Sequence, residues 1–139
     1  MNQAPALTES VTLEETSFTL LDINKVINDF YSSVSKDPLL SVPFSSVTDW
    51  PHHIDNLTHF WWIKFGGARY SDARYNPPMK HFKAGFSQEF LTRWLELFKV
   101  SLDKNLTPKQ ADTWFGMSQR MGQFLLQKNE AMKASFKNG

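Results

Sequence analysis

Histidine offers the widest range of chemistry in this 139-residue chain, because the chain contains no cysteine. Disulfides, thiolate metal sites and cysteine nucleophiles are thereby excluded. The four histidines are His52, His53, His59 and His81. His52 and His59 are two helical turns apart, and Asp55 with His59 forms an i, i+4 pair that could hold a surface metal ion. No His-Glu-x-x-His motif accompanies them, so solvated histidines are the favoured interpretation.

Other signatures of enzyme active sites are missing or unspecific. The sequence has no Gly-x-Ser-x-Gly nucleophile elbow, and Gly66-Gly67 lacks the spacing of a phosphate-binding loop. Paired carboxylates for acid–base catalysis stay possible, but nothing in the sequence singles out one pair. These motifs therefore identify no enzyme class by themselves.

Charge and hydropathy narrow the possible partners. Lys and Arg number 15 against 14 Asp and Glu, which leaves a formal charge of +1, and neither sign collects in a long run. We therefore expect no face for nucleic acid or for an anionic membrane surface. Apolar stretches such as Phe60-Trp61-Trp62-Ile63 fall far short of the roughly 20 residues of a membrane span. The N-terminus lacks the pattern of a secretory signal, so we expect a soluble protein of the cytoplasm.

The elements that must position the histidines are helices. Apolar residues at three- and four-residue steps predict a first helix that begins with Asp22 as N-cap and ends at Asp37-Pro38. A second helix is predicted to begin between Thr48 and Pro51 and to end at Gly66-Gly67. It carries three of the four histidines.

Two further helices are predicted in the second half of the chain. Ser87 is a suitable N-cap for one of them. Thr107-Pro108-Lys109-Gln110 combines an N-cap, a first-position proline and a capping-box glutamine, and so begins the last long helix. Between the helix pairs, residues 68–78 show no periodicity, and Pro78 can start one short turn over Met79–His81. An irregular segment of this length in a small domain is often functional.

No strand pattern competes with these helices. Residues 1–18 are rich in Thr, Ser and Glu, and we expect them to form a flexible or loosely docked extension. Residues 19–139 then form one all-α domain. Its aromatic content of 14% exceeds what a compact bundle of this length needs, so a flat apolar group could be housed inside. An ordinary aromatic core is the simpler explanation on composition alone.

Six motifs follow one another over roughly residues 20 to 127. They are Phe30-Tyr31, Phe44, Trp50-Pro-His-His53, Phe60-Trp61, Met79-Lys-His81 and Gln88-Glu-Phe90-Leu-Thr-Arg-Trp94-Leu-Glu-Leu-Phe98. Each motif is weak alone, but their order and spacing together form a fairly specific signature. In this order the chain resembles the truncated haemoglobins, group III branch.

The resemblance implies a truncated globin, a two-over-two helical sandwich around one haem b (iron protoporphyrin IX). It implies that His81 is the proximal ligand of the haem iron. Without the resemblance, His81 would most simply be an exposed loop residue. The residues that it places against the haem are Phe30, Phe44, Trp61, Met79, His81 and Trp94.

On the distal side, the resemblance implies three polar side chains. The Tyr31 hydroxyl would donate a hydrogen bond to a ligand such as dioxygen, and the Trp94 indole N–H would be a second donor. His53 would control ligand access or exchange protons with the ligand. Ordinary packing is the alternative role for Tyr31 and Trp94.

The function implied by the resemblance is binding of O2, NO and other small ligands at the iron. A polar distal side favours redox chemistry on the ligand, either dioxygenation of nitric oxide to nitrate or a peroxidase-like reaction. The chain has no flavin or nicotinamide motif, so the electrons would come from a separate reductase. A reversible O2 carrier or sensor without turnover is the alternative, and a cofactor-free helical interaction module is the simplest one.

Overall fold

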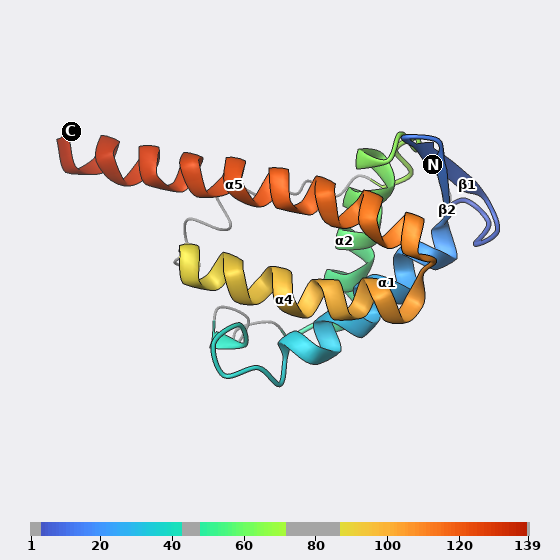
Figure 1. Ribbon diagram of the computed structural model, residues 1–139, viewed down its shortest axis with the longest axis horizontal. Helices are drawn as coiled ribbons and strands as arrows, with labels where there is room; N and C mark the ends of the chain where they lie inside the picture. The colour runs from blue at the N-terminus through green and yellow to red at the C-terminus, as the bar shows by residue number, and fades with distance from the viewer. Residues whose placement is uncertain (1–3, 43–47, 72–86, 139) are drawn as a thin grey trace.

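Helices make up most of the protein, whose computed structural model is shown in Figure 1. The structure describes residues 4–42, 48–71 and 87–138, with side chains as far as residue 131. The elements in chain order are β1 (Ser10–Leu13), β2 (Thr16–Thr19), α1 (Leu20–Val34), α2 (Trp50–Lys64), α4 (Gln88–Asn105) and α5 (Pro108–Asn138). The predicted all-α class is confirmed, with a small hairpin added in front of the first helix.

The helix α1 begins three residues earlier than predicted. Its N-cap is Thr19, whose hydroxyl accepts a hydrogen bond from the Asp22 N–H, while the Asp22 carboxylate accepts one from the Thr19 N–H. Asp22 is thus the third helical residue of a capping box, and its prediction as the N-cap is wrong. Both residues carry side-chain oxygens suited to capping, and Leu20 at the first helical position is buried in the core, which favours the earlier start.

The ends of the other helices follow the local signals of the sequence. Ser87 caps α4 by accepting a hydrogen bond from the Phe90 N–H. Thr107 and Gln110 exchange hydrogen bonds of 3.0 and 3.2 Å at the start of α5, which confirms the predicted capping box. After α2, Gly66 has a φ of +100°, a conformation that glycine adopts without steric cost and that ends the helix.

An antiparallel hairpin precedes α1. Ser10 pairs with Thr19 and Leu13 with Thr16, which leaves Glu14 and Glu15 as a two-residue turn. Both turn residues have positive φ values, 50° and 64°, as a type I′ turn requires. The expectation that no strand occurs is therefore wrong. Glu-Glu is not among the Asn-Gly or Asp-Gly pairs that normally signal such a turn, so local sequence rules do not predict this hairpin.

Phe18 attaches the hairpin to the helices. Its side chain is fully buried, stacks on Phe65 at 4.7 Å and meets Trp114 edge-on at 5.9 Å. Gln110 at the start of α5 also donates a 2.8 Å hydrogen bond from Nε2 to the Ser17 carbonyl. Residues 10–18 therefore pack onto the helical domain, whereas the division of the chain at residue 18 stays a prediction.

The four helices form two antiparallel pairs. α1 packs along α2, α4 packs along α5, and α1 contacts α4. In Figure 1, the pair of α4 and α5 crosses in front of the pair of α1 and α2, which gives the predicted two-over-two arrangement. α5 extends well beyond the N-terminal end of α4. None of the described helices combines the length and the apolar character needed to cross a membrane.

Candidate functional site

Phe30 stands at the centre of a cluster of aromatic side chains where α1, α2 and α4 meet. It is fully buried, and its ring centroid lies 4.9 Å from those of Tyr31, Trp94 and Phe98. All three contacts are edge-on, the arrangement that aromatic quadrupoles favour. Phe30 thereby connects the α1 tyrosine to the tryptophan of α4, two of the residues predicted for the distal side.

Tyr31 lies against the first turn of α2. Its ring centroid is 5.7 Å from that of His53 and 6.1 Å from that of Trp50, and Trp50 and His53 are themselves 5.4 Å apart. The three rings form a mixed polar and aromatic group on one side of Phe30. Tyr31 also lines a pocket of about 200 Å³ between α1 and α2, together with Trp50 and Ile54.

Trp94 and Trp61 occupy different surroundings. Trp94 packs on Phe98 at 4.6 Å but is only partly buried. Trp61 is 5% exposed and contacts Phe98 at 6.1 Å and Trp114 at 5.4 Å. Trp61 is thus part of the aromatic core, and Phe98 links that core to Trp94.

An ion pair with a buried carboxylate and a partly exposed arginine holds α4 against the segment that follows α1. The Asp37 carboxylate accepts hydrogen bonds from the Leu40 and Leu39 N–H groups, at 2.9 and 3.1 Å, and from Arg93 Nε at 2.8 Å. The Leu40 N–H, assisted by the Arg93 guanidinium, holds the pKa of Asp37 below its usual range although burial opposes this. Arg93 directly precedes Trp94, so this pair fixes the part of α4 that carries the tryptophan.

His59 is buried on α2, contrary to the expectation that the helix histidines are solvated. It is 3% exposed, and its Nε2 accepts a 3.2 Å hydrogen bond from the Tyr70 N–H. The Tyr70 ring meets the imidazole edge-on at 4.5 Å. Burial lowers the pKa of His59, and the nearby positive charge of Arg69 lowers it further. His59 therefore anchors the segment that follows α2.

The same observation removes the surface metal site from consideration for the described part of the chain. The Tyr70 N–H occupies Nε2 of His59, so this nitrogen is not open to a metal ion shared with His52 and Asp55. Within the described residues, no three His, Asp or Glu side chains come together in a way that could hold a metal ion.

Of the residues predicted for the site, the structure brings together Phe30, Tyr31, His53 and Trp94. Three others, Phe44, Met79 and His81, lie outside the described residues, so the predicted proximal ligand stays a prediction. Trp50 is not among the predicted site residues, yet its ring lies close to those of both Tyr31 and His53. Its position three residues before His53, on the same side of a helix, is the signal that could have identified it.

Comparison with known proteins agrees with this arrangement. The family model for bacterial-like globins matches residues 20–127. The structure is similar to the group III truncated haemoglobin from Campylobacter jejuni, with a TM-score of 0.72 and 26% identity over 84% of this chain and 94% of that one.

Other solved structures share the fold. A thermostable haemoglobin from the actinobacterium Thermobifida fusca has a TM-score of 0.58 and 25% identity, over 82% of this chain and 89% of the other. The group II truncated haemoglobin from Bacillus anthracis has a TM-score of 0.66 at 18% identity, over 78% and 85% of the two chains. No curated protein matches the chain.

Proposed function

The chain belongs to the bacterial-like globin family, which implies a haem cofactor, and we propose that it performs redox chemistry on a small ligand bound at that haem. The observation that carries the proposal is the group of Tyr31, His53 and Trp94 around Phe30. In this group, side chains that can donate hydrogen bonds lie next to aromatic rings. We infer that the haem is haem b and that the ligands include O2 and NO.

The described residues fit a flat apolar group. Trp94 contacts the fully buried Phe30 and Phe98, yet part of its indole surface is left uncovered. The side chains around it in this cluster are aromatic, and the charge of Arg93, the residue before Trp94, is paired with Asp37. A porphyrin would find apolar surface here without meeting an unpaired charge.

Tyr31, Trp94 and His53 have different proposed roles on the distal side. The Tyr31 O–H donates to a ligand that carries partial negative charge, and the Trp94 indole N–H is available as a second donor. His53, whose ring is edge-on to Tyr31, orients the phenol and exchanges protons with the ligand. Fixed donors of this kind stabilise charge as it develops, because they need no reorganisation when the charge appears.

His81 is the proposed proximal ligand. Its support is the order of motifs in the sequence, since the residue lies outside the described part of the structure. When bound, haem supplies an iron that takes up diatomic ligands and changes its oxidation state. The chain itself would supply the imidazole of His81, an apolar surface around Trp94 and the hydrogen-bond donors of Tyr31 and Trp94.

The favoured reaction is dioxygenation of nitric oxide, and a peroxidase-like reaction is the alternative. Joining one NO to one O2 and adding one electron yields nitrate, so each turnover consumes one electron. The chain offers no motif for flavin or nicotinamide, and we propose a separate reductase as the donor. The proposal places this chemistry in the cytoplasm.

Haem titration tests the cofactor and its anchor. We expect the wild-type chain to bind haemin one to one with a sharp Soret band, and the His81→Ala variant to lose that band or to shift it to a weak-ligand spectrum. The matched control is His52→Ala, which removes an exposed histidine of α2 and is expected to leave the spectrum unchanged. A folded wild-type chain without a saturable haem spectrum would contradict the proposal.

Product analysis distinguishes turnover from simple ligand binding. Reduced, air-equilibrated protein is mixed with nitric oxide in the presence of an electron-donating system, and nitrate is measured against time. We expect nitrate to exceed the amount of protein several-fold. Reversible O2 uptake without nitrate would instead identify a carrier or a sensor.

A further inference from the structure

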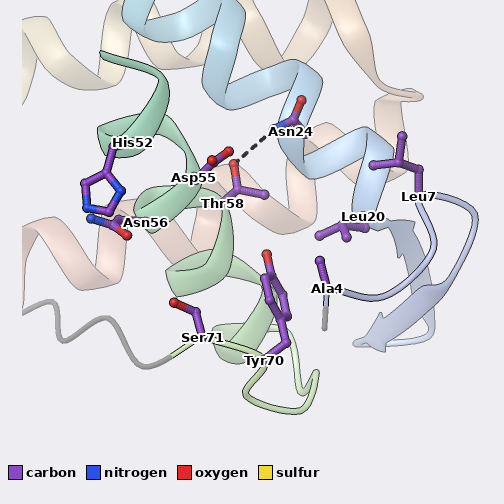
Figure 2. Close-up of a pocket in the computed structure, with 10 residues that line it drawn as sticks. All are labelled: Ala4, Leu7, Leu20, Asn24, His52, Asp55, Asn56, Thr58, Tyr70 and Ser71. Carbon is purple, nitrogen blue, oxygen red and sulfur yellow. Dashed lines mark hydrogen bonds between the residues drawn. The ribbon is translucent and has the colours of Figure 1, made fainter. Parts of the chain in front are cut away.

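A pocket of about 410 Å³ lies between α2, the start of α1, the N-terminal segment and the residues after α2. Figure 2 shows the side chains that line it. None of the predicted site residues lines this pocket, so the haem proposal does not account for it.

Two side chains that line this pocket, Asp55 and Tyr70, carry oxygen atoms available to a ligand. Within the described part of the chain, neither the Asp55 carboxylate nor the Tyr70 hydroxyl makes a hydrogen bond or an ion pair. In Figure 2 the Tyr70 hydroxyl points toward Asp55 and Thr58. The Thr58 hydroxyl donates to the Ile54 carbonyl at 2.9 Å and accepts from Asn24 Nδ2 at 3.4 Å, which leaves it one acceptor position.

The charge in the pocket is negative. Asp55 is the carboxylate of the lining, and its field reaches the phenol, since burial and the Asp55 charge together raise the pKa of Tyr70. The nearby cation Arg69 donates from Nη1 to the Ser71 carbonyl at 3.2 Å, and none of the ion pairs among the described residues joins it to Asp55. An incoming positive group would therefore meet Asp55 as its counter-ion.

The opposite wall is apolar and comes from the N-terminal half of the chain. Leu20 at the start of α1 is buried, and Leu7 and Ala4 of the N-terminal segment stand beside it in Figure 2. Leu7 is 53% exposed, although it is a large hydrophobic residue. A ligand with a short hydrocarbon portion would cover this surface.

We propose that this pocket binds a small primary alkylammonium ion. The three N–H groups of an ammonium match the three oxygens of Asp55, Thr58 and Tyr70, and the alkyl chain lies against Leu7 and Leu20. Such a ligand would contact both the N-terminal segment and α2. The proposal is independent of the haem, because it uses none of the residues assigned to that site.

The test is a titration of the ¹⁵N-labelled full chain, as purified, with n-butylammonium chloride, followed by NMR. We expect saturable shifts of the backbone amides of Asp55, Tyr70 and Leu7 with a dissociation constant of about 1 mM, as for a ligand of five heavy atoms. Asp55→Asn is expected to weaken binding at least tenfold, and Tyr70→Phe several-fold. Asp112→Asn, which removes an exposed carboxylate of α5, is the matched control and is expected to bind like the wild type.

Butan-1-ol and sodium butyrate separate the contributions of charge and chain. Both share the hydrocarbon portion, so weaker binding of the alcohol and still weaker binding of the carboxylate are expected from the Asp55 charge. The proposal is overturned if no amide shift saturates below about 100 mM, which corresponds to a negligible affinity. It is also overturned if Asp55→Asn binds as tightly as the wild type, or if butyrate binds better than butylammonium.

Discussion

The side chain of Tyr31 lies between the aromatic core and the first turn of α2. Its ring packs on Phe30 within the core, and its other neighbours, His53 and Trp50, belong to the first turn of α2. The side chain is 7% exposed, so its position is set by packing and little freedom remains to the phenol. A donor that is fixed before the ligand arrives loses little conformational entropy when the ligand binds.

Replacing Tyr31 by Phe tests the proposed donor at this scale. Loss of one hydrogen bond to a charged acceptor, worth about 1.5–3 kcal/mol, is expected to speed O2 dissociation by roughly ten- to a hundredfold. The measurement is stopped-flow displacement of O2 from the reduced protein. Tyr70→Phe, which removes a phenol that lines a different pocket from Tyr31, serves as the control and is expected to leave the rate unchanged. An unchanged rate in Tyr31→Phe would make Trp94 or His53 the principal donor.

At the scale of elements, the hairpin stands out because its turn is built from unfavourable residues. Glu14 and Glu15 both adopt positive φ values, a conformation that costs a residue with a Cβ roughly 1 kcal/mol. The turn persists because the strands are fixed at their far end, where Phe18 is buried and Gln110 donates to the Ser17 carbonyl. Packing thus overrides the local preference of the turn.

Glu15→Gly is therefore expected to stabilise the protein. Glycine adopts positive φ without steric cost, so we expect a gain of about 1 kcal/mol and a rise in Tm of a few degrees, measured by thermal unfolding. Glu15→Ala is the matched control, since it removes the carboxylate but keeps the Cβ. A similar rise in both variants would show that charge, and not backbone strain, is relieved.

For the whole molecule, pH acts on stability through the buried His59. Its pKa is lowered in the folded state, so the unfolded chain binds the proton more readily. Its contribution to stability is then complete above the unfolded pKa of about 6.5 and declines as the pH falls from there toward the folded pKa. Protonation also puts a hydrogen on Nε2, the atom that accepts from the Tyr70 N–H, so this hydrogen bond is lost.

We accordingly expect the urea midpoint of the wild type to fall between pH 7 and pH 5, and His59→Gln to show a smaller decline. Glutamine does not titrate in this range and can still accept a hydrogen bond. His52→Gln, at an exposed position of the same helix, is expected to keep the full decline. An equal decline in wild type and His59→Gln would assign the pH dependence to other groups.

Features that depend on neighbouring residues follow from the amino-acid sequence without knowledge of the fold. The caps at Ser87 and at Thr107 with Gln110, and the end of α2 at Gly66, are set by contacts within one turn of helix. The family could also be predicted from the sequence, because the order of the motifs is specific although each motif alone is weak. The family-model match over residues 20–127 confirms this prediction.

Contacts between residues far apart in the chain become known only from the folded structure. The Asp37–Arg93 pair joins residues 56 positions apart, and His59 is buried because the segment after α2 folds back so that the Tyr70 N–H reaches its ring. The hairpin forms because Phe18 finds Phe65 and Trp114. Local patterns contain no information on such pairs, since burial and long-range hydrogen bonds depend on where whole helices lie. The same holds for the pocket beside Asp55, whose walls come from three separate stretches of the chain.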